Sequence, residues 1–385
     1  MIKNKLDNYL QKRRCTLLGV GPMSKNCVDA TIELANDSEA PLMLIASRRQ
    51  IDAEEFGGGY VNNWTTEEYA RYVIENDKKG KVILARDHGG PWQNPIEIDN
   101  KLSLRQAMES AKKSYHADIK SGFEIIHIDP SVDIYSSPNV DEVLLRVFEL
   151  MEYCHEVATK YGKKIEYEIG TEEQSGGNNS IEEIEYVLDK VRSYCSTNKL
   201  PFPMFIVLQS GTKVLETRNV GTLDTPFRIA HELPAEIQVP RILEICDRYN
   251  IYFKEHNTDY LNNESLSMHP KFGIHAANVA PEFGVAETKA FIKLLEENKL
   301  NKLKDEFVDL AFNSRKWEKW MLPNSTNDKL GKAIIAGHYV FSKPEMSEIK
   351  LKAQASIKGV NIDEYLKYEV KHAILRYMKC FRLSN

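Results

Sequence analysis

The chain has 385 residues, of which 28% are charged and 42% hydrophobic, and its formal net charge is -5. This length exceeds one small domain and suits either a large α/β barrel with an appendage or two domains. No long basic run is present, which excludes a nucleic-acid-binding surface, and no apolar run reaches the roughly 20 residues that a membrane-spanning helix needs.

The N-terminal segment and the cysteines favour a reduced compartment. Residues 1–15 mix charged residues with Leu and Tyr and contain no apolar signal core. The six cysteines are scattered without C-x-x-C or other paired spacing. We therefore expect a cytoplasmic protein with free thiols.

Eight short apolar segments, separated by amphipathic helical stretches, predict a parallel sheet. The segments are residues 16–20, 41–46, 81–86, 123–128, 164–169, 203–209, 251–256 and 271–276. Residues 137–162 carry apolar side chains on one helical face, between an Asp/Asn start and a Gly stop. Eight is the number of strands that closes a (β/α)8 TIM barrel. An open doubly wound sheet is the alternative, but no G-x-G-x-x-G follows the first segment.

The strand pattern fades after about residue 290 and helical patterns replace it. We predict an α/β TIM barrel over residues 1–290 and a C-terminal helical extension over residues 291–385. Within the extension, residues 333–345 are expected to form an extended arm or a lid. Trp317 and Trp320 stand at helical spacing and are expected in the core of the extension.

Strand alternation predicts which side chains face the barrel interior. In residues 164–169, Glu166 and Glu168 share the face opposite three apolar side chains, so two carboxylates are expected inside. Lys254 and His256 share a face in the same way. Buried carboxylates need cations, hydrogen bonds or protons. Four polar residues then lie at strand C-termini, where barrels of this kind carry their sites: His88, Glu168, Gln209 and His256.

The two histidines of this set, His88 and His256, indicate a metal site. His88 follows Asp87 directly at a strand end, and His256 faces inward near Glu168, which is the set of nitrogen and oxygen donors that binds a divalent ion such as Zn²⁺. His127 shares an inward face with Asp129, but we interpret His127 as a structural histidine.

Glycine-rich segments follow several of the predicted strands, at residues 56–60, 87–90, 175–179 and 210–214. Backbone N–H groups in such loops either bind phosphate oxygens or simply form turns. Four nearby residues are candidate phosphate ligands: Gly211, Lys213, Arg218 and Lys254.

Six segments together resemble a known family. EFGGGY, ARDHGGPWQ, HIDPS, YEIGTEEQSGG, VLQSGT and KEHNTDY are similar, in order and spacing, to the GatZ/KbaZ-type subunit of class II D-tagatose-1,6-bisphosphate aldolase, from roughly residue 16 to residue 284. That family is similar in turn to class II fructose-bisphosphate aldolases, which are metal-dependent TIM barrels.

The resemblance implies roles for the strand-end residues. Asp87 would move protons, and His88, Glu168 and His256 would bind the metal. Gln209 stands where the catalytic aldolases place a third metal-binding histidine.

The resemblance also implies substrate contacts around the barrel mouth. Asn257 and Asp259 lie in KEHNTDY and are candidate contacts. Arg48 and Arg49 replace neutral residues of the family and would either bind a carboxylate or phosphate or form a solvated pair. 

The leading hypothesis is a metal-dependent lyase or epimerase that acts on a ketose phosphate through an enediolate, with Zn²⁺ or another divalent ion. Asp87 would be its acid/base, with Glu172 or Glu173 as a second candidate. One alternative is a non-catalytic subunit that supports a separate class II aldolase, and another is a sugar or sugar-acid 4-epimerase. The expected partners are a sugar-phosphate substrate, the aldolase subunit and further copies of the chain, with no nucleic acid or membrane.

Overall fold

A closed barrel of eight parallel strands forms the centre of the protein, in the spatial order β1-β10-β9-β6-β5-β4-β3-β2. The computed structural model describes residues 2–171, 180–208, 210–223 and 233–384. The barrel strands are β1 (Leu17–Val20), β2 (Leu42–Ser47), β3 (Val82–Gly89), β4 (Ile125–Ile128), β5 (Glu166–Ile169), β6 (Phe205–Val207), β9 (Tyr252–Glu255) and β10 (Ala276–Val279). The predicted α/β TIM barrel with a helical extension is confirmed.

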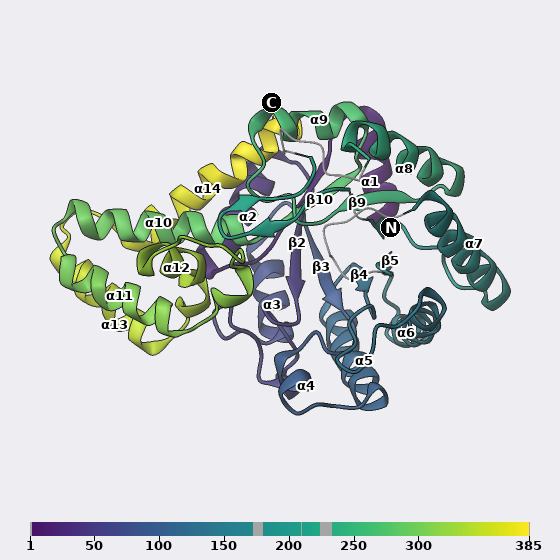
Figure 1. The fold of residues 1–385 in the computed structure, drawn as a ribbon, viewed down its shortest axis with the longest axis horizontal. Helices are drawn as coiled ribbons and strands as arrows, with labels where there is room; N and C mark the ends of the chain where they lie inside the picture. The colour runs from purple at the N-terminus through teal and green to yellow at the C-terminus, as the bar shows by residue number, and fades with distance from the viewer. Residues whose placement is uncertain (1, 172–179, 209, 224–232, 385) are drawn as a thin grey trace.

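Helices cover the outside of the barrel (Figure 1). Thr65 and Asn139 begin two of them through capping boxes with Glu68 and Glu142, because these side chains satisfy backbone N–H groups of the first turn. The outer helices are α2 (Lys25–Ser38), α3 (Thr66–Asn76), α5 (Leu104–Ser121), α6 (Val140–Lys160), α7 (Ile181–Asn198), α8 (Ala235–Tyr249) and α9 (Asn263–Phe272), with the short α4 (Pro95–Asp99) before α5.

The barrel interior is apolar at its N-terminal end. Helix α1 (Ile2–Lys12) closes this end, where Ile2 and Leu6 pack in one cluster with Met43 and Phe205 of the barrel strands. Burial of each such side chain contributes about 1.5–3 kcal/mol. Polar side chains are therefore concentrated at the C-terminal end of the barrel, which is described below.

The chain after the barrel builds a helical lobe and then returns to the barrel. The lobe, at the left of Figure 1, contains α10 (Pro281–Glu297), α11 (Asn301–Asn313), α12 (Lys329–Ala336) and α13 (Pro344–Ser356), and has its own apolar cluster. Helix α14 (Ile362–Cys380) packs against α2 and α10 and takes the place of an outer barrel helix. The division at residue 290 stays a prediction.

Two predicted elements differ from the structure. The eighth strand is residues 276–279 rather than 271–276, because α9 continues to Phe272 and Gly273 ends it with a left-handed φ of 95°. Residues 333–345 are helical rather than extended: they contain the end of α12, the 3-10 helix η3 (Gly337–Val340) and the start of α13. Asp328 caps α12, and Pro344 stands in the first turn of α13, a position that favours a helix start.

Two further features complete the mouth of the barrel. A short hairpin, β7 (Val214–Leu215) and β8 (Arg218–Asn219), follows β6, and the 3-10 helix η2 (Glu318–Trp320) lies between α11 and α12. Among the described residues, no helix combines the length and apolar composition needed to cross a bilayer.

Candidate active site and metal centre

Strand β3 ends in an irregularity that brings two adjacent side chains to the barrel mouth. In a regular strand, neighbouring side chains point to opposite faces. The pairing of β3 with β4 shifts register between Arg86 and Gly89, and His88 adopts a left-handed φ of 44°. The His88 N–H donates to Nδ1 of His127 at 3.1 Å. A bulge of this kind re-aims a side chain, so Asp87 and His88 both reach the site.

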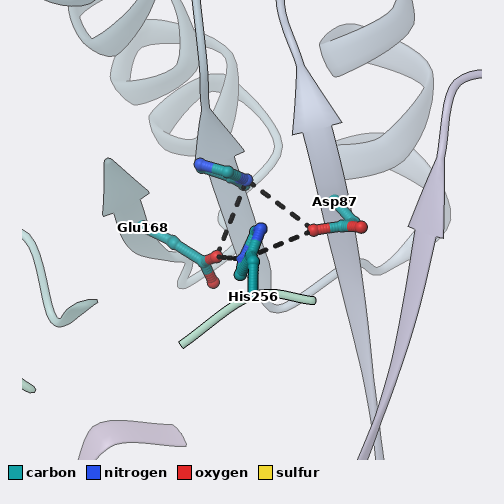
Figure 2. Close-up of side chains that lie close together, drawn as sticks. Asp87, Glu168 and His256 are labelled. Atoms are coloured by element: carbon teal, nitrogen blue, oxygen red, sulfur yellow. Dashed lines mark hydrogen bonds and ion pairs between the residues drawn. The ribbon is translucent and has the colours of Figure 1, made fainter. Parts of the chain in front are cut away.

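Asp87, His127, Glu168 and His256 form a buried cluster inside the barrel, and one donor atom from each lies within 4.8 Å of the others. They come from β3, β4, β5 and the residue after β9. In Figure 2, His256 lies between Glu168 and Asp87, with Nε2 3.1 Å from Glu168 Oε1 and 3.7 Å from Asp87 Oδ1. Asn278 of β10 donates through Nδ2 to Asp87 Oδ1 at 3.1 Å.

A second set of donors adjoins the first and contains His88, His127 and Asp129. Nδ1 of His88 lies 2.8 Å from Asp129 Oδ2, and Ser131 donates to the other Asp129 oxygen. The His88 ring centroid is 5.0 Å from that of His256 and 5.5 Å from that of His127. Three imidazoles and three carboxylates therefore converge, and His127 belongs to both sets.

The two carboxylates of the cluster remain anionic in spite of burial. Burial favours the protonated form, but the Lys254 ammonium, 2.6 Å from Glu168 Oε2, lowers the pKa of Glu168 to about 2. In the same way, the charge of His88 outweighs burial and holds the pKa of Asp87 well below its ordinary value. These oxygens are thus available to bind a cation or to accept a proton.

The two histidines nearest the cavity differ in charge. Burial lowers the pKa of His88, but Asp87 and Asp129 outweigh it and raise the pKa to about 9. Burial lowers the pKa of His256, whose side chain is almost inaccessible, whereas 32% of the His88 side chain is exposed to the cavity. A neutral imidazole such as that of His256 is the form that binds a metal ion.

A cavity of about 690 Å³ opens onto the cluster. Asp87, His88 and His256 line it from the barrel. The helical lobe supplies another part of the wall, through Lys319 and Tyr339. The volume of the cavity is within the range of sites that bind a small molecule.

The two predicted arginine contacts have different surroundings. Arg48 is buried, and its guanidinium pairs with Asp52 at 3.0 Å and Glu97 at 2.5 Å. Both arginines line the cavity, but Arg49 is exposed. Since Arg48 is held by internal carboxylates, Arg49 has the better geometry to meet a ligand.

Three predicted contacts lie on or after β9. Lys254 is buried in the barrel, where it pairs with Glu168. Asn257 and Asp259 line the cavity. Asp259 accepts hydrogen bonds from the backbone N–H groups of Ala280 and Glu282, and burial first, then the Glu282 charge, raises its pKa to about 8.

The predicted phosphate loop after β6 is not among the described residues that line the cavity. Gly211 has a left-handed φ of 87°, and a Cβ there would clash with Thr222. Lys213 is half-buried, and Arg218 is exposed and pairs with Glu216 at 3.2 Å. Three other predicted site residues lie outside the described residues: Glu172, Glu173 and Gln209.

The sequence predicts a structural role for His127, whereas the structure places it in both sets of donors, and the sequence does not point to Asn278 or to the lobe residues of the cavity wall. His127 had the right signal, an inward position beside Asp129 at the end of a predicted strand. Asn278 was missed because the eighth strand was placed too early in the chain. Trp320 was expected in the core of the extension, but it lines the cavity and donates through Nε1 to the Tyr339 hydroxyl at 3.3 Å.

Comparison with known proteins identifies the family. Residues 2–203 match the family model described as "D-tagatose-1,6-bisphosphate aldolase subunit GatZ/KbaZ-like". The chain belongs to the GatZ/KbaZ-like family. It is 24% identical over 263 residues to "D-tagatose-1,6-bisphosphate aldolase subunit GatZ" of Escherichia coli O157:H7. The matched region covers 64% of this chain and 58% of that protein. The chain thus spans little more than half of the length of this curated relative.

Solved structures share the fold of this GatZ/KbaZ-like chain. A probable tagatose 6 phosphate kinase from Sinorhizobium meliloti 1021 superposes with a TM-score of 0.76 at 16% identity, over 95% of this chain and 100% of the other. The fructuronate-tagaturonate epimerase UxaE from Cohnella laeviribosi gives 0.60 at 10% identity, over 96% and 81%. The YdjI aldolase from Escherichia coli K12 gives 0.55 at 12% identity, over 100% and 98%.

Proposed function

We propose that this chain is a metal-dependent enzyme of the class II aldolase type, which cleaves, forms or epimerises a ketose phosphate. The observation that carries the proposal is the convergence of Asp87, His127, Glu168 and His256 within 4.8 Å at the base of a large cavity. This is the C-terminal end of the barrel, where TIM-barrel enzymes carry their catalytic residues. The family description and the aldolase and epimerase folds among the structural relatives agree with this class of reaction.

The residues of the cluster fit a divalent cation. Imidazole nitrogens and carboxylate oxygens are the donors of catalytic zinc sites. Asn278, which lies beside Asp87 and His256, has its Oδ1 buried without a hydrogen-bond partner among the described residues, so a polar atom at the site has unused capacity. His127, Glu168 and His256 would hold the ion, with His88 beside them. Such an ion acts as a Lewis acid that stabilises negative charge developing on the oxygens of a substrate.

Asp87 is the residue that we assign to proton transfer. It is anionic, is held by Asn278 and faces the cavity. In aldol cleavage it would accept the proton of the C4 hydroxyl while the C3–C4 bond breaks to give an aldehyde and an enediolate. Addition of the enediolate to the other face of the same aldehyde would invert C4, so epimerisation needs the same groups. Glu172 and Glu173 stay predictions for a second acid/base.

Metal removal tests this proposal. We expect the purified protein to contain about one equivalent of a divalent metal by elemental analysis. A chelator should abolish turnover of a ketose bisphosphate. Turnover is measured with a coupled assay that detects the triose phosphate product. His256→Ala and His127→Ala should each lower metal affinity at least tenfold, whereas His372→Ala, at an exposed position of α14, should keep it. Full turnover after chelation would contradict the proposal.

The second candidate is a non-catalytic subunit that supports a separate class II aldolase. The names of the curated relatives, which describe an aldolase subunit, favour it, as does Gln209 in place of a histidine. In that case the isolated chain would hold no metal and would co-purify with an aldolase whose activity falls without it. Metal content and independent turnover therefore separate the two candidates.

A further inference from the structure

Besides Arg48, three cationic side chains line the cavity. Arg49 follows β2, and Lys316 and Lys319 come from the segment around η2. The catalytic cluster of Asp87 and His256 lines the same cavity from the barrel. A single cavity therefore joins the proposed proton-transfer and metal centre to a group of positive charges.

These cations form no ion pair or side-chain hydrogen bond within the described parts of the chain. The neighbouring Arg48, by contrast, is fully engaged by Asp52 and Glu97. Lys319 contacts ring faces instead, with Nζ 4.5 Å from the centroid of Trp320 and 5.8 Å from that of Tyr339. Cationic side chains that share a cavity repel one another unless an anion lies between them.

The electrostatic environment of Lys319 agrees with this reading. The surrounding protein disfavours its charged form, and the charges of Arg49 and Lys316 add to this effect, so that the pKa of Lys319 falls to about 7. The Lys319 side chain is nevertheless exposed, and it lines the cavity. An anionic ligand would remove the repulsion and restore the ammonium form.

Contacts between the lobe and the barrel hold these cations in place. The Ser342 hydroxyl donates to the backbone oxygen of Tyr60, and Asn63 donates to the Ser342 oxygen at 3.2 Å. The Glu216 N–H after β7 donates to the Trp320 oxygen at 2.7 Å. The lobe is thus attached to the barrel at two places, one of them at Trp320 beside Lys319.

We propose that Arg49, Lys316 and Lys319 bind the terminal anionic group of the substrate, a phosphate or a carboxylate, while its carbonyl end lies at the Asp87–His256 cluster. This inference rests on the proposed function and makes the helical lobe part of the active site. Besides Asp87 at the metal cluster, Asp99 and Asp259 line the cavity, and Asp259 accepts hydrogen bonds from backbone N–H groups, so Asp99 is the further carboxylate to set against three cations. The group of cations therefore keeps a net positive charge.

Calorimetric binding of three matched ketoses tests the inference. D-fructose 6-phosphate, D-fructuronate and D-fructose carry a phosphate, a carboxylate or a hydroxyl at the same carbon. We expect at least one of the two anions to bind tenfold or more tightly than D-fructose, and the tighter of them identifies the group that the site prefers. Arg49→Gln and Lys319→Gln should each weaken that anion at least tenfold without changing metal content, whereas Lys302→Gln, an exposed cation of the lobe, should not.

The outcomes separate this inference from the proposed function. Equal binding of all three ketoses, no binding of either anion, or unchanged affinity in both cavity variants would overturn the anion site. Loss of anion binding in the variants of a protein that contains no metal would support the anion site and remove the proposed metal chemistry. Lower affinity at higher salt would agree with a charge contact.

Discussion

Glu287 of α10 shows how one buried group can set the pH dependence of stability. Ser24 and Asn26 donate hydrogen bonds to its carboxylate. The charge of Lys350 lowers the pKa of Glu287, and the charge of Asp363 raises it. Burial, the largest effect, raises its pKa to about 7. The native state therefore keeps a proton on Glu287 at pH values where the unfolded chain has already lost it.

We expect the free energy of unfolding to fall as pH rises from about 4.5 to about 7, because the folded pKa of this acid is above its unfolded value. The shift corresponds to a loss on the order of 3 kcal/mol, which Glu287→Gln should remove. Urea denaturation between pH 5 and pH 8 measures this, with the exposed Glu348→Gln as control. Parallel pH profiles of the wild type and Glu287→Gln would contradict the assignment.

At the scale of elements, one arginine links β3 to its neighbours just before the proposed site residues Asp87 and His88. Arg86 points away from the barrel interior, opposite to Asp87, and makes a bidentate pair with Asp118 of α5. Its guanidinium also donates to the backbone oxygens of Ala46 and Ile51, each at 2.8 Å. Both partners of the pair are fully buried, so each depends on the other for its charge.

Arg86→Met should destabilise the protein by about 3–5 kcal/mol, because it leaves the Asp118 carboxylate buried without a cation. The double variant Arg86→Met/Asp118→Leu should recover part of this loss, because it removes the unpaired charge. Chemical denaturation of both variants gives the comparison. A single variant within 1 kcal/mol of the wild type would show that the pair is not needed to hold α5 on β3.

At the scale of the whole molecule, the last helix completes the barrel layer. Helix α14 lies beside α2 although most of the chain separates them (Figure 1). Val370, Ile374, Tyr377 and Met378 of α14 are buried in the same cluster as the barrel strands and outer helices. At about 1.5–3 kcal/mol for each side chain, their burial is comparable with the net stability of a typical domain.

A chain that ends at residue 360 should therefore fail to give a soluble, folded protein, as measured by circular dichroism and size-exclusion chromatography. Because a truncation can fail for several reasons, Ile374→Ala provides a milder test. We expect it to cost about 2–5 kcal/mol, while Tyr368→Ala at an exposed position of the same helix stays near the wild type. Equal stability of the two variants would contradict a packing role for α14.

Local patterns in the sequence were sufficient to predict the barrel and which residues of its strands face inward. Eight short apolar segments predicted eight strands, of which the eighth was placed too early, and period-two alternation placed Glu168, Lys254 and His256 inside, where the structure has them. These features follow from the sequence because they depend on residues a few positions apart.

The remaining features required contacts between residues far apart in the chain. The register shift that directs His88 toward Asp129 depends on the pairing of β3 with β4, and the position of β10 depends on where α9 ends. The approach of Lys319 to a cavity lined by Asp87 depends on the packing of a separate lobe against the barrel. No short-range periodicity in the sequence predicts these contacts, because they depend on how distant segments of the chain pack in the tertiary structure.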